Sequence, residues 1–118
     1  MVEKNLEKEF INVCRKYGGE NDSSLGYVYC YFQPNFPMEQ MTLRFGTTSP
    51  TLRVTAGHSH VELTDIEDIF SHRPNSILFV NKHGDVVNVR PSIGIATFNG
   101  DVKGSIWCCD LEGVRKSI

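Results

Sequence analysis

Residues 41–56 have the sequence MTLRFGTTSPTLRVTA, in which apolar and polar side chains alternate on both sides of a polar loop. Alternation of this kind is typical of half-buried strands, so the segment predicts a β-hairpin. With a loop over 47–50, Phe45 lies opposite Leu52 and Leu43 lies opposite Val54. The apolar pairs then share one face, as packing against a core requires.

The same register puts Arg44 directly opposite Arg53 on the other face of the hairpin. Like charges in opposed positions weaken a strand pair. We therefore expect compensation from a nearby carboxylate, from water or from a bound anionic partner.

The preceding segment, 27–32, also alternates, and consecutive strands are often neighbours in a sheet. Its core side would carry Val28, Cys30 and Phe32. Its other side would extend the arginine surface into a Tyr/Arg face, which consists of Tyr27, Tyr29, Tyr31, Thr42, Arg44, Arg53 and Thr55. Tyr and Arg are enriched at binding hot spots. The alternative is that these are ordinary half-buried strand tyrosines, covered by a helix or wetted by solvent.

Two helices are predicted N-terminal to Pro74. The first carries an apolar stripe at helical spacing, formed by Leu6, Phe10, Val13, Cys14 and Tyr17, and stops at Gly18-Gly19. The second is short. It follows the capping-box pattern Thr64-Asp65-Ile66-Glu67 and ends before Pro74.

The remaining segments predict strands and a last short helix. Residues 58–63 continue extended, and 77–80 and 86–89 flank a tight-turn composition. Residues 93–98 and 102–107 flank Asn99-Gly100, a strong hairpin signal. A C-terminal helix is expected from Asp110 through Lys116.

These elements define an α+β fold: a mainly antiparallel sheet of six to seven strands with an N-terminal, a middle and a C-terminal helix. We expect a single α+β domain over residues 1–118. The chain has 118 residues with 40% hydrophobic side chains and a formal net charge of −2. This composition excludes a disordered chain and disfavours a nucleic-acid binder that relies on general positive charge.

Compartment signals point to the cytoplasm. The N-terminal residues are too charged for a signal peptide, and no apolar run is long enough to span a membrane. No membrane partner is therefore expected. The four cysteines, Cys14, Cys30, Cys108 and Cys109, lack a C-x-x-C spacing and are expected to be reduced thiols.

Two clusters of ligand-type side chains lie in the middle of the chain. His58, His60 and Glu62 share one face of an extended segment and are a weak metal candidate, although exposed strand histidines are common without a ligand. The acidic group Glu62, Asp65, Glu67 and Asp68 either stabilises a helix N-terminus or presents negative charge to a basic partner such as a nuclease.

No catalytic signature is present: the sequence has neither a Gly-x-Ser-x-Gly elbow nor a glycine-rich phosphate loop. We therefore expect no catalytic residues and no cofactor. The sequence favours a non-enzymatic binding protein, an inhibitor or immunity-type antagonist that occludes another protein. Its expected partner-binding residues are Tyr27, Tyr29, Tyr31, Arg44, Arg53, Glu62, Asp65, Glu67 and Asp68.

Two alternatives from other classes stay open. One is a small-ligand, nucleotide or nucleic-acid binder that stacks bases on the tyrosines and holds phosphates with the arginines. The other is a small histidine-dependent hydrolase centred on His58, His60 and Glu62. Homodimerisation through an exposed edge strand is compatible with each of these functions.

Overall fold

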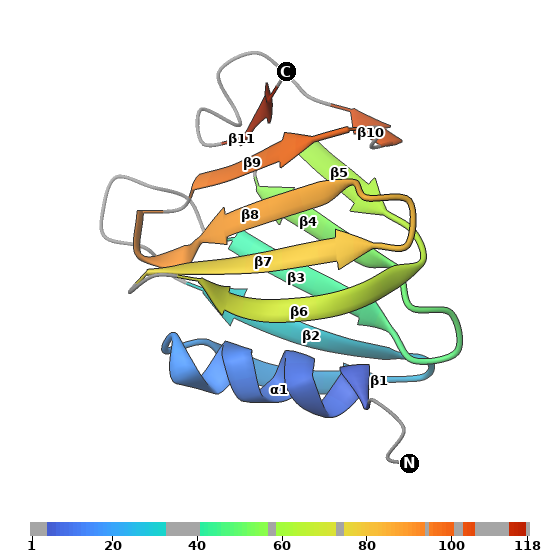
Figure 1. The fold of residues 1–118 in the computed structure, drawn as a ribbon. Coiled ribbons are helices and arrows are strands. Elements are labelled where there is room, and N and C mark those ends of the chain that lie inside the picture. Colours follow the sequence, from blue (N-terminus) through green and yellow to red (C-terminus); the bar gives the residue numbers. More distant parts are fainter. Residues whose placement is uncertain are drawn as a thin grey trace.

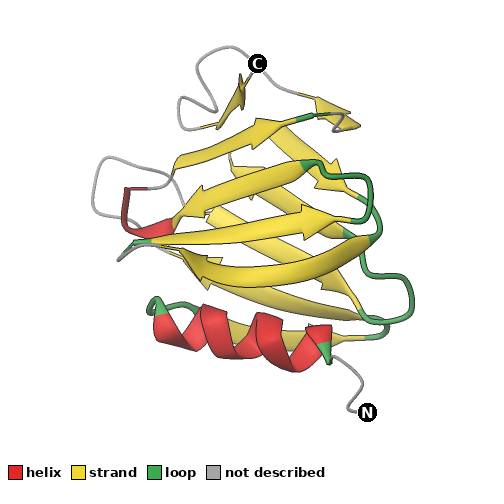
Figure 2. Cartoon of the chain, viewed as in Figure 1, coloured by secondary structure: helices red, strands yellow, loops and turns green. Residues whose placement is uncertain are grey.

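A computed structural model of the chain describes residues 5–32, 41–56, 59–72, 75–93, 95–100, 103–105 and 114–117. In these residues two β-sheets face each other, and one helix lies across an open end of the sandwich (Figures 1 and 2). The helix is α1 (Leu6–Lys16), and a 3-10 turn covers Pro91–Ile93. Among the described residues no helix is both long and apolar enough to cross a membrane.

The larger sheet has six strands in the order β1-β2-β3-β4-β5-β10. Every neighbouring pair in it is antiparallel. Its strands are β1 (Glu20–Ser24), β2 (Tyr27–Phe32), β3 (Met41–Gly46), β4 (Leu52–Ala56), β5 (Ser59–Leu63) and β10 (Lys103–Ser105).

The smaller sheet has five strands in the order β11-β9-β8-β7-β6. Its pairs are antiparallel except for β11 and β9, which run parallel. Its strands are β6 (Ile66–His72), β7 (Ser76–Asn81), β8 (Val86–Arg90), β9 (Ile95–Asn99) and β11 (Val114–Ser117).

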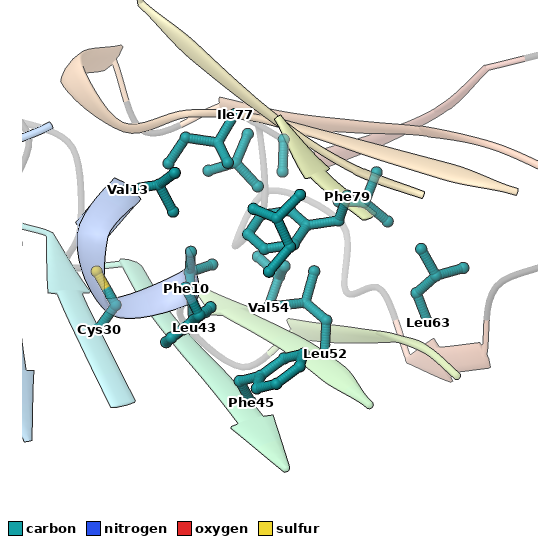
Figure 3. Packing of buried hydrophobic residues seen from close by; sticks show 14 of the residues in the cluster. Phe10, Val13, Cys30, Leu43, Phe45, Leu52, Val54, Leu63, Ile77 and Phe79 are labelled. Atoms are coloured by element: carbon teal, nitrogen blue, oxygen red, sulfur yellow. The ribbon is translucent and has the colours of Figure 1, made fainter. Parts of the chain in front are cut away.

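The core lies between the two sheets and under α1 (Figure 3). Alternate residues of β3, β4 and β7 point into it, so one side of each strand is apolar. Phe10 of α1 stacks on Phe45 of β3 at a centroid distance of 5.3 Å and lies 6.2 Å from Phe79 of β7. One helical side chain therefore joins the two sheets.

The N-terminal helix is confirmed. Asn5 caps its first turn by accepting a hydrogen bond from the Lys8 backbone N–H at 3.0 Å. The predicted stripe faces the core, because Phe10, Val13 and Cys14 are buried. The helix ends just before Gly18, whose φ of +83° favours glycine.

The expectation of four reduced thiols is wrong for Cys14 and Cys30, which form a disulfide between α1 and β2. The two sulfurs can bond to each other because each cysteine lies on the inward side of its element and the Cα atoms are 5.9 Å apart. Gly19 packs against this bond, since a Cβ there would approach both sulfurs and Phe32 to within 2.7–2.8 Å. Cysteine usage therefore no longer supports a cytosolic location. Cys108 and Cys109 lie outside the described residues.

The predicted middle helix is wrong, because Ile66–His72 forms strand β6 instead. The register with β7 shifts between Ile66 and Asp68, which marks a β-bulge. The extra residue turns both Ile66 and Ile69 toward the core, and both are buried. A bulged strand thus reproduces the three-residue spacing of a helix.

Two predictions for the C-terminal third are also wrong. Residues 103–105 pair with β5 in the larger sheet and not with β9, so the chain changes sheets after Gly100 and makes no hairpin there. Val114–Ser117 is strand β11 and not part of a helix, while Asp110 lies outside the described residues. The prediction of a mainly antiparallel arrangement is confirmed, but the prediction of one sheet of six to seven strands is wrong, because the described strands form a six-stranded and a five-stranded sheet.

Candidate functional site

The register predicted from the hairpin sequence is confirmed. Arg44 lies opposite Arg53, and the apolar pairs Phe45/Leu52 and Leu43/Val54 lie on the core side. β2 is the neighbour of β3, as expected, with Tyr29 opposite Arg44. One row of residues consequently crosses all six strands: Asp22, Tyr29, Arg44, Arg53, Glu62 and Lys103.

The Tyr/Arg face lies on the outer side of the six-stranded sheet. Tyr27 is 38% exposed, and Tyr29 and Tyr31 are half-buried. α1 lies on the inner side of β2, where Cys14 meets Cys30, so this helix does not cover the tyrosines. The arginine side chains keep 27% exposure at Arg44 and 32% at Arg53.

Contacts between rings order the tyrosines along β2. The Tyr29 and Tyr31 rings are nearly parallel, with centroids 6.0 Å apart, and Tyr27 lies 6.3 Å from Tyr29. The Arg44 guanidinium lies over the Tyr27 ring at 4.3 Å, within the range of a cation–π interaction. Arg44 is thus held against Tyr27 at one end of the tyrosine row.

Glu62 is the carboxylate that compensates the two opposed arginines. Its Oε2 atom lies 3.8 Å from Arg44 Nη2 and 3.7 Å from Arg53 Nε. Glu62 reaches both because β5 lies beside β4, with Glu62 opposite Arg53. The sequence pattern predicts a need for compensation here, but it does not predict that Glu62 meets that need.

We expect Glu62→Gln to lower the free energy of unfolding by about 1 kcal/mol, because the paired arginines lose their shared counter-charge. The measurement is urea unfolding at low salt and at about 0.5 M NaCl, where screening should shrink the difference. Glu67→Gln is the matched control, since Glu67 is exposed on β6 of the other sheet. Equal losses in the two variants would contradict this role of Glu62.

A hollow of about 420 Å³ borders the Tyr/Arg face. Two loop tips form its rim, the β1–β2 turn at Leu25 and the β3–β4 loop at Thr48–Thr51, and Tyr27, Arg44 and Glu62 also line it. Leu25 is 95% exposed. The sequence pattern predicts no function for either loop, and the one signal that it contains there is a lone leucine, Leu25, in a polar turn.

The acidic group does not gather around a helix. Asp65 lies in the β5–β6 turn with a positive φ of 57°, and its Oδ2 is 3.8 Å from His83 Nε2. Glu67 and Asp68 belong to β6 in the smaller sheet, whereas Glu62 belongs to the larger one. Of these four carboxylates, Glu62 is therefore the one that joins the arginines.

The histidine candidate is only partly within the described residues. His60 lies on β5 opposite Thr55, beside Glu62 on the same face, and His58 lies outside the described part of the chain. Among the residues that the structure describes, no group of three or more His, Cys, Asp or Glu side chains is arranged to hold a metal ion.

Comparison of the chain with protein-family models, with curated proteins and with solved structures finds no match. Only the site itself therefore points to a function.

Proposed function

We propose that this chain is a non-enzymatic binding protein that recognises another protein through its Tyr/Arg face. The observation that carries the proposal is the gathering of three tyrosines and two arginines, each partly exposed, on one side of one sheet. Such side chains supply a large contact area and a polar tip, and they dominate the energetics of many protein interfaces.

Contacts that fix the side chains of the Tyr/Arg face add support. The Tyr29 and Tyr31 rings stack, and Arg44 is held between Tyr27 and Glu62. Side chains that are already fixed lose less conformational entropy when a partner binds. A face of this kind is suited to occluding a partner's surface, and we extend the proposal to an inhibitor or immunity-type antagonist.

The nuclease form of this proposal has less support. It depends on an acidic group that faces a basic partner, whereas Glu67 and Asp68 lie on β6 of the other sheet and Asp65 lies in the β5–β6 turn. The proposed surface carries two guanidinium groups and one carboxylate.

Tyr29→Ala/Tyr31→Ala should weaken binding of the native partner by at least about thirtyfold, the effect of losing a hot spot. The measurement is capture from the native host followed by quantitative titration of the captured protein. Phe70→Ala is the matched control, because Phe70 is 45% exposed on β6 of the other sheet. Recovery of no stoichiometric protein, or equal weakening by both variants, would contradict the proposal.

Nucleotide binding is the second candidate, favoured by the parallel Tyr29 and Tyr31 rings beside two arginines. Glu62 counts against it, because a carboxylate within 4 Å of both arginines competes with a phosphate. Anisotropy of a labelled single-stranded oligonucleotide or cyclic nucleotide at low salt separates the two candidates. A salt-sensitive rise that Tyr29→Ala abolishes would favour this second function.

A further inference from the structure

We infer that the outer side of β1 and β2 receives an extended basic segment of the partner, in which every second residue is arginine or lysine. The surface consists of Glu20, Asp22, Tyr29 and Tyr31, which together form an acid–tyrosine strip. This inference rests on the proposed function and specifies the chemistry of the partner. Glu20 and Asp22 are separate from the acidic group predicted from the sequence.

The register of β1 and β2 places each carboxylate of the strip beside a ring. Glu20 lies opposite Tyr31 and Asp22 lies opposite Tyr29, so the four side chains share the outer side of the sheet. Both acidic residues are exposed. β1 is the last strand of the six-stranded sheet, and within the described part of the chain it pairs with β2 alone. The strip therefore lies open at the margin of the Tyr/Arg face.

Charge complementarity selects a cation as the occupant. β1 and β2 have the sequences ENDSS and YVYCYF, which contain two carboxylates and no basic residue. Among the described residues, neither Glu20 nor Asp22 forms an ion pair. Arg44, opposite Tyr29, has its guanidinium over the Tyr27 ring and 3.8 Å from Glu62. An incoming cation therefore meets two carboxylates that have no counter-charge of their own.

The rings favour an arginine or lysine side chain over a small inorganic cation. Tyr29 and Tyr31 present nearly parallel rings with centroids 6.0 Å apart. The face of an aromatic ring attracts an ammonium or guanidinium group, and a guanidinium also stacks on it. Arg44 contacts Tyr27 in this way within the chain itself, at 4.3 Å. A basic side chain of the partner can contact a ring of the strip and donate hydrogen bonds to the carboxylate beside it.

The spacing of the carboxylates favours an extended segment. Glu20 and Asp22 are two residues apart on one strand, which separates them by about 6.8 Å. An extended segment repeats its side chains on one side at the same distance. Asp22 is also held in position, because its Oδ1 accepts a hydrogen bond from the Ser23 backbone N–H at 2.8 Å. Two basic residues with one residue between them can therefore face both carboxylates at once.

The same charges count against two other occupants. A second copy of the chain would bring two identical strips together, and with them four carboxylates and no cation. A phosphate backbone is repelled by the carboxylates of the strip. A basic protein segment has neither disadvantage.

The test uses isotope-labelled full-length chain with its disulfide intact and three capped peptides, Ser-Arg-Ser-Arg-Ser, Ser-Gln-Ser-Gln-Ser and Ser-Glu-Ser-Glu-Ser. We expect the arginine peptide to shift the amide NMR signals of residues 20–24, 29 and 31. The glutamine peptide should bind about tenfold more weakly, because it lacks the ion pairs and the cation–π contacts. About 0.5 M NaCl should reduce this difference. The glutamate peptide should leave the signals unchanged.

Glu20→Gln/Asp22→Asn should abolish the preference for the arginine peptide over the glutamine peptide. The asparagine side chain keeps an acceptor for the Ser23 N–H, so the variant removes charge without removing that hydrogen bond. Glu7→Gln/Glu67→Gln is the matched control, because it removes two exposed carboxylates from α1 and β6 and should leave the titration unchanged.

Equal binding of the arginine and glutamine peptides, tighter binding of the glutamate peptide, or no shift at the strip would each overturn the inference. Shifts of residues 20–24 that grow with the concentration of the free chain would overturn it in favour of a second copy.

The captured partner separates this inference from the proposed function. If its binding requires Tyr29 and Tyr31 but tolerates Glu20→Gln/Asp22→Asn, the proposed function stands and the inference fails. If no partner is captured while the arginine peptide binds at the strip, the proposed function fails and the strip remains a site for basic segments.

Discussion

Phe10→Ala is expected to lower the free energy of unfolding by about 3–5 kcal/mol, the usual cost of removing a buried aromatic side chain. Phe10 is only 1% exposed and contacts Phe45 of the larger sheet and Phe79 of the smaller one. Its loss leaves a cavity where the helix and both sheets meet. Urea or guanidinium unfolding measures the change directly.

Two further variants make this prediction decisive. Asn12→Ala, at an exposed position of the same helix, should change the stability by less than about 0.5 kcal/mol. Phe10→Met should lose only about 1.5 kcal/mol, since it keeps most of the buried volume, and it serves if the alanine variant does not fold. A loss below about 1.5 kcal/mol for Phe10→Ala would show that the helix does not join the two sheets.

Cys14→Ala/Cys30→Ala is expected to lower the free energy of unfolding by about 3 kcal/mol. The disulfide joins two positions that are 16 residues apart in the sequence, and this loop lowers the conformational entropy of the unfolded chain. The melting temperature should fall by on the order of 10 °C. Both cysteines are buried, so alanine is used in place of serine, whose hydroxyl would lie unpaired in the core.

Reduction distinguishes the effect of losing the disulfide from the effect of replacing the two cysteine side chains. Dithiothreitol should destabilise the wild-type chain and leave the double alanine variant unaffected. A Cys108→Ala/Cys109→Ala variant should keep the sensitivity of the wild type to the reductant. A wild-type chain that melts at the same temperature with and without the reductant would contradict a stabilising Cys14–Cys30 bond.

The predictable parts of the fold are those in which the local sequence pattern is compatible with only one secondary structure and register. Apolar and polar residues alternate without interruption along β2, β3 and β4, so a shift of one residue would bury Arg44 and expose Leu43. The register and the outer position of the tyrosines follow from that constraint. The α1 stripe is equally unambiguous.

Other parts depend on contacts that a local pattern does not contain. The bulge in β6 gives Ile66 and Ile69 a helical spacing, and the pattern alone cannot separate the two solutions. β1 has the sequence ENDSS and lacks any apolar residue, so it carries no strand signal of its own. It forms because the edge of β2 offers it hydrogen bonds.

In the candidate site, too, some residues are predictable from local pattern and others are not. Local alternation places Tyr29, Arg44 and Arg53 together, because they lie on successive strands. Glu62 and Lys103 enter the row through pairings that depend on how β5 and β10 are arranged in the sheet. The Cys14–Cys30 bond likewise depends on the packing of α1 against β2.

The strict separation of the two sides of β2–β5 has an evolutionary consequence. Odd-numbered positions of β2 face outward and even-numbered positions face inward, so the residues proposed to contact a partner are not the residues that hold the sheets together. A lineage can therefore exchange Tyr29 or Arg44 for other side chains without disturbing the interior, and under the proposed function such an exchange changes the specificity. Descendants of this chain would be expected to diverge fastest on that outer side while retaining Val28, Cys30 and Phe32.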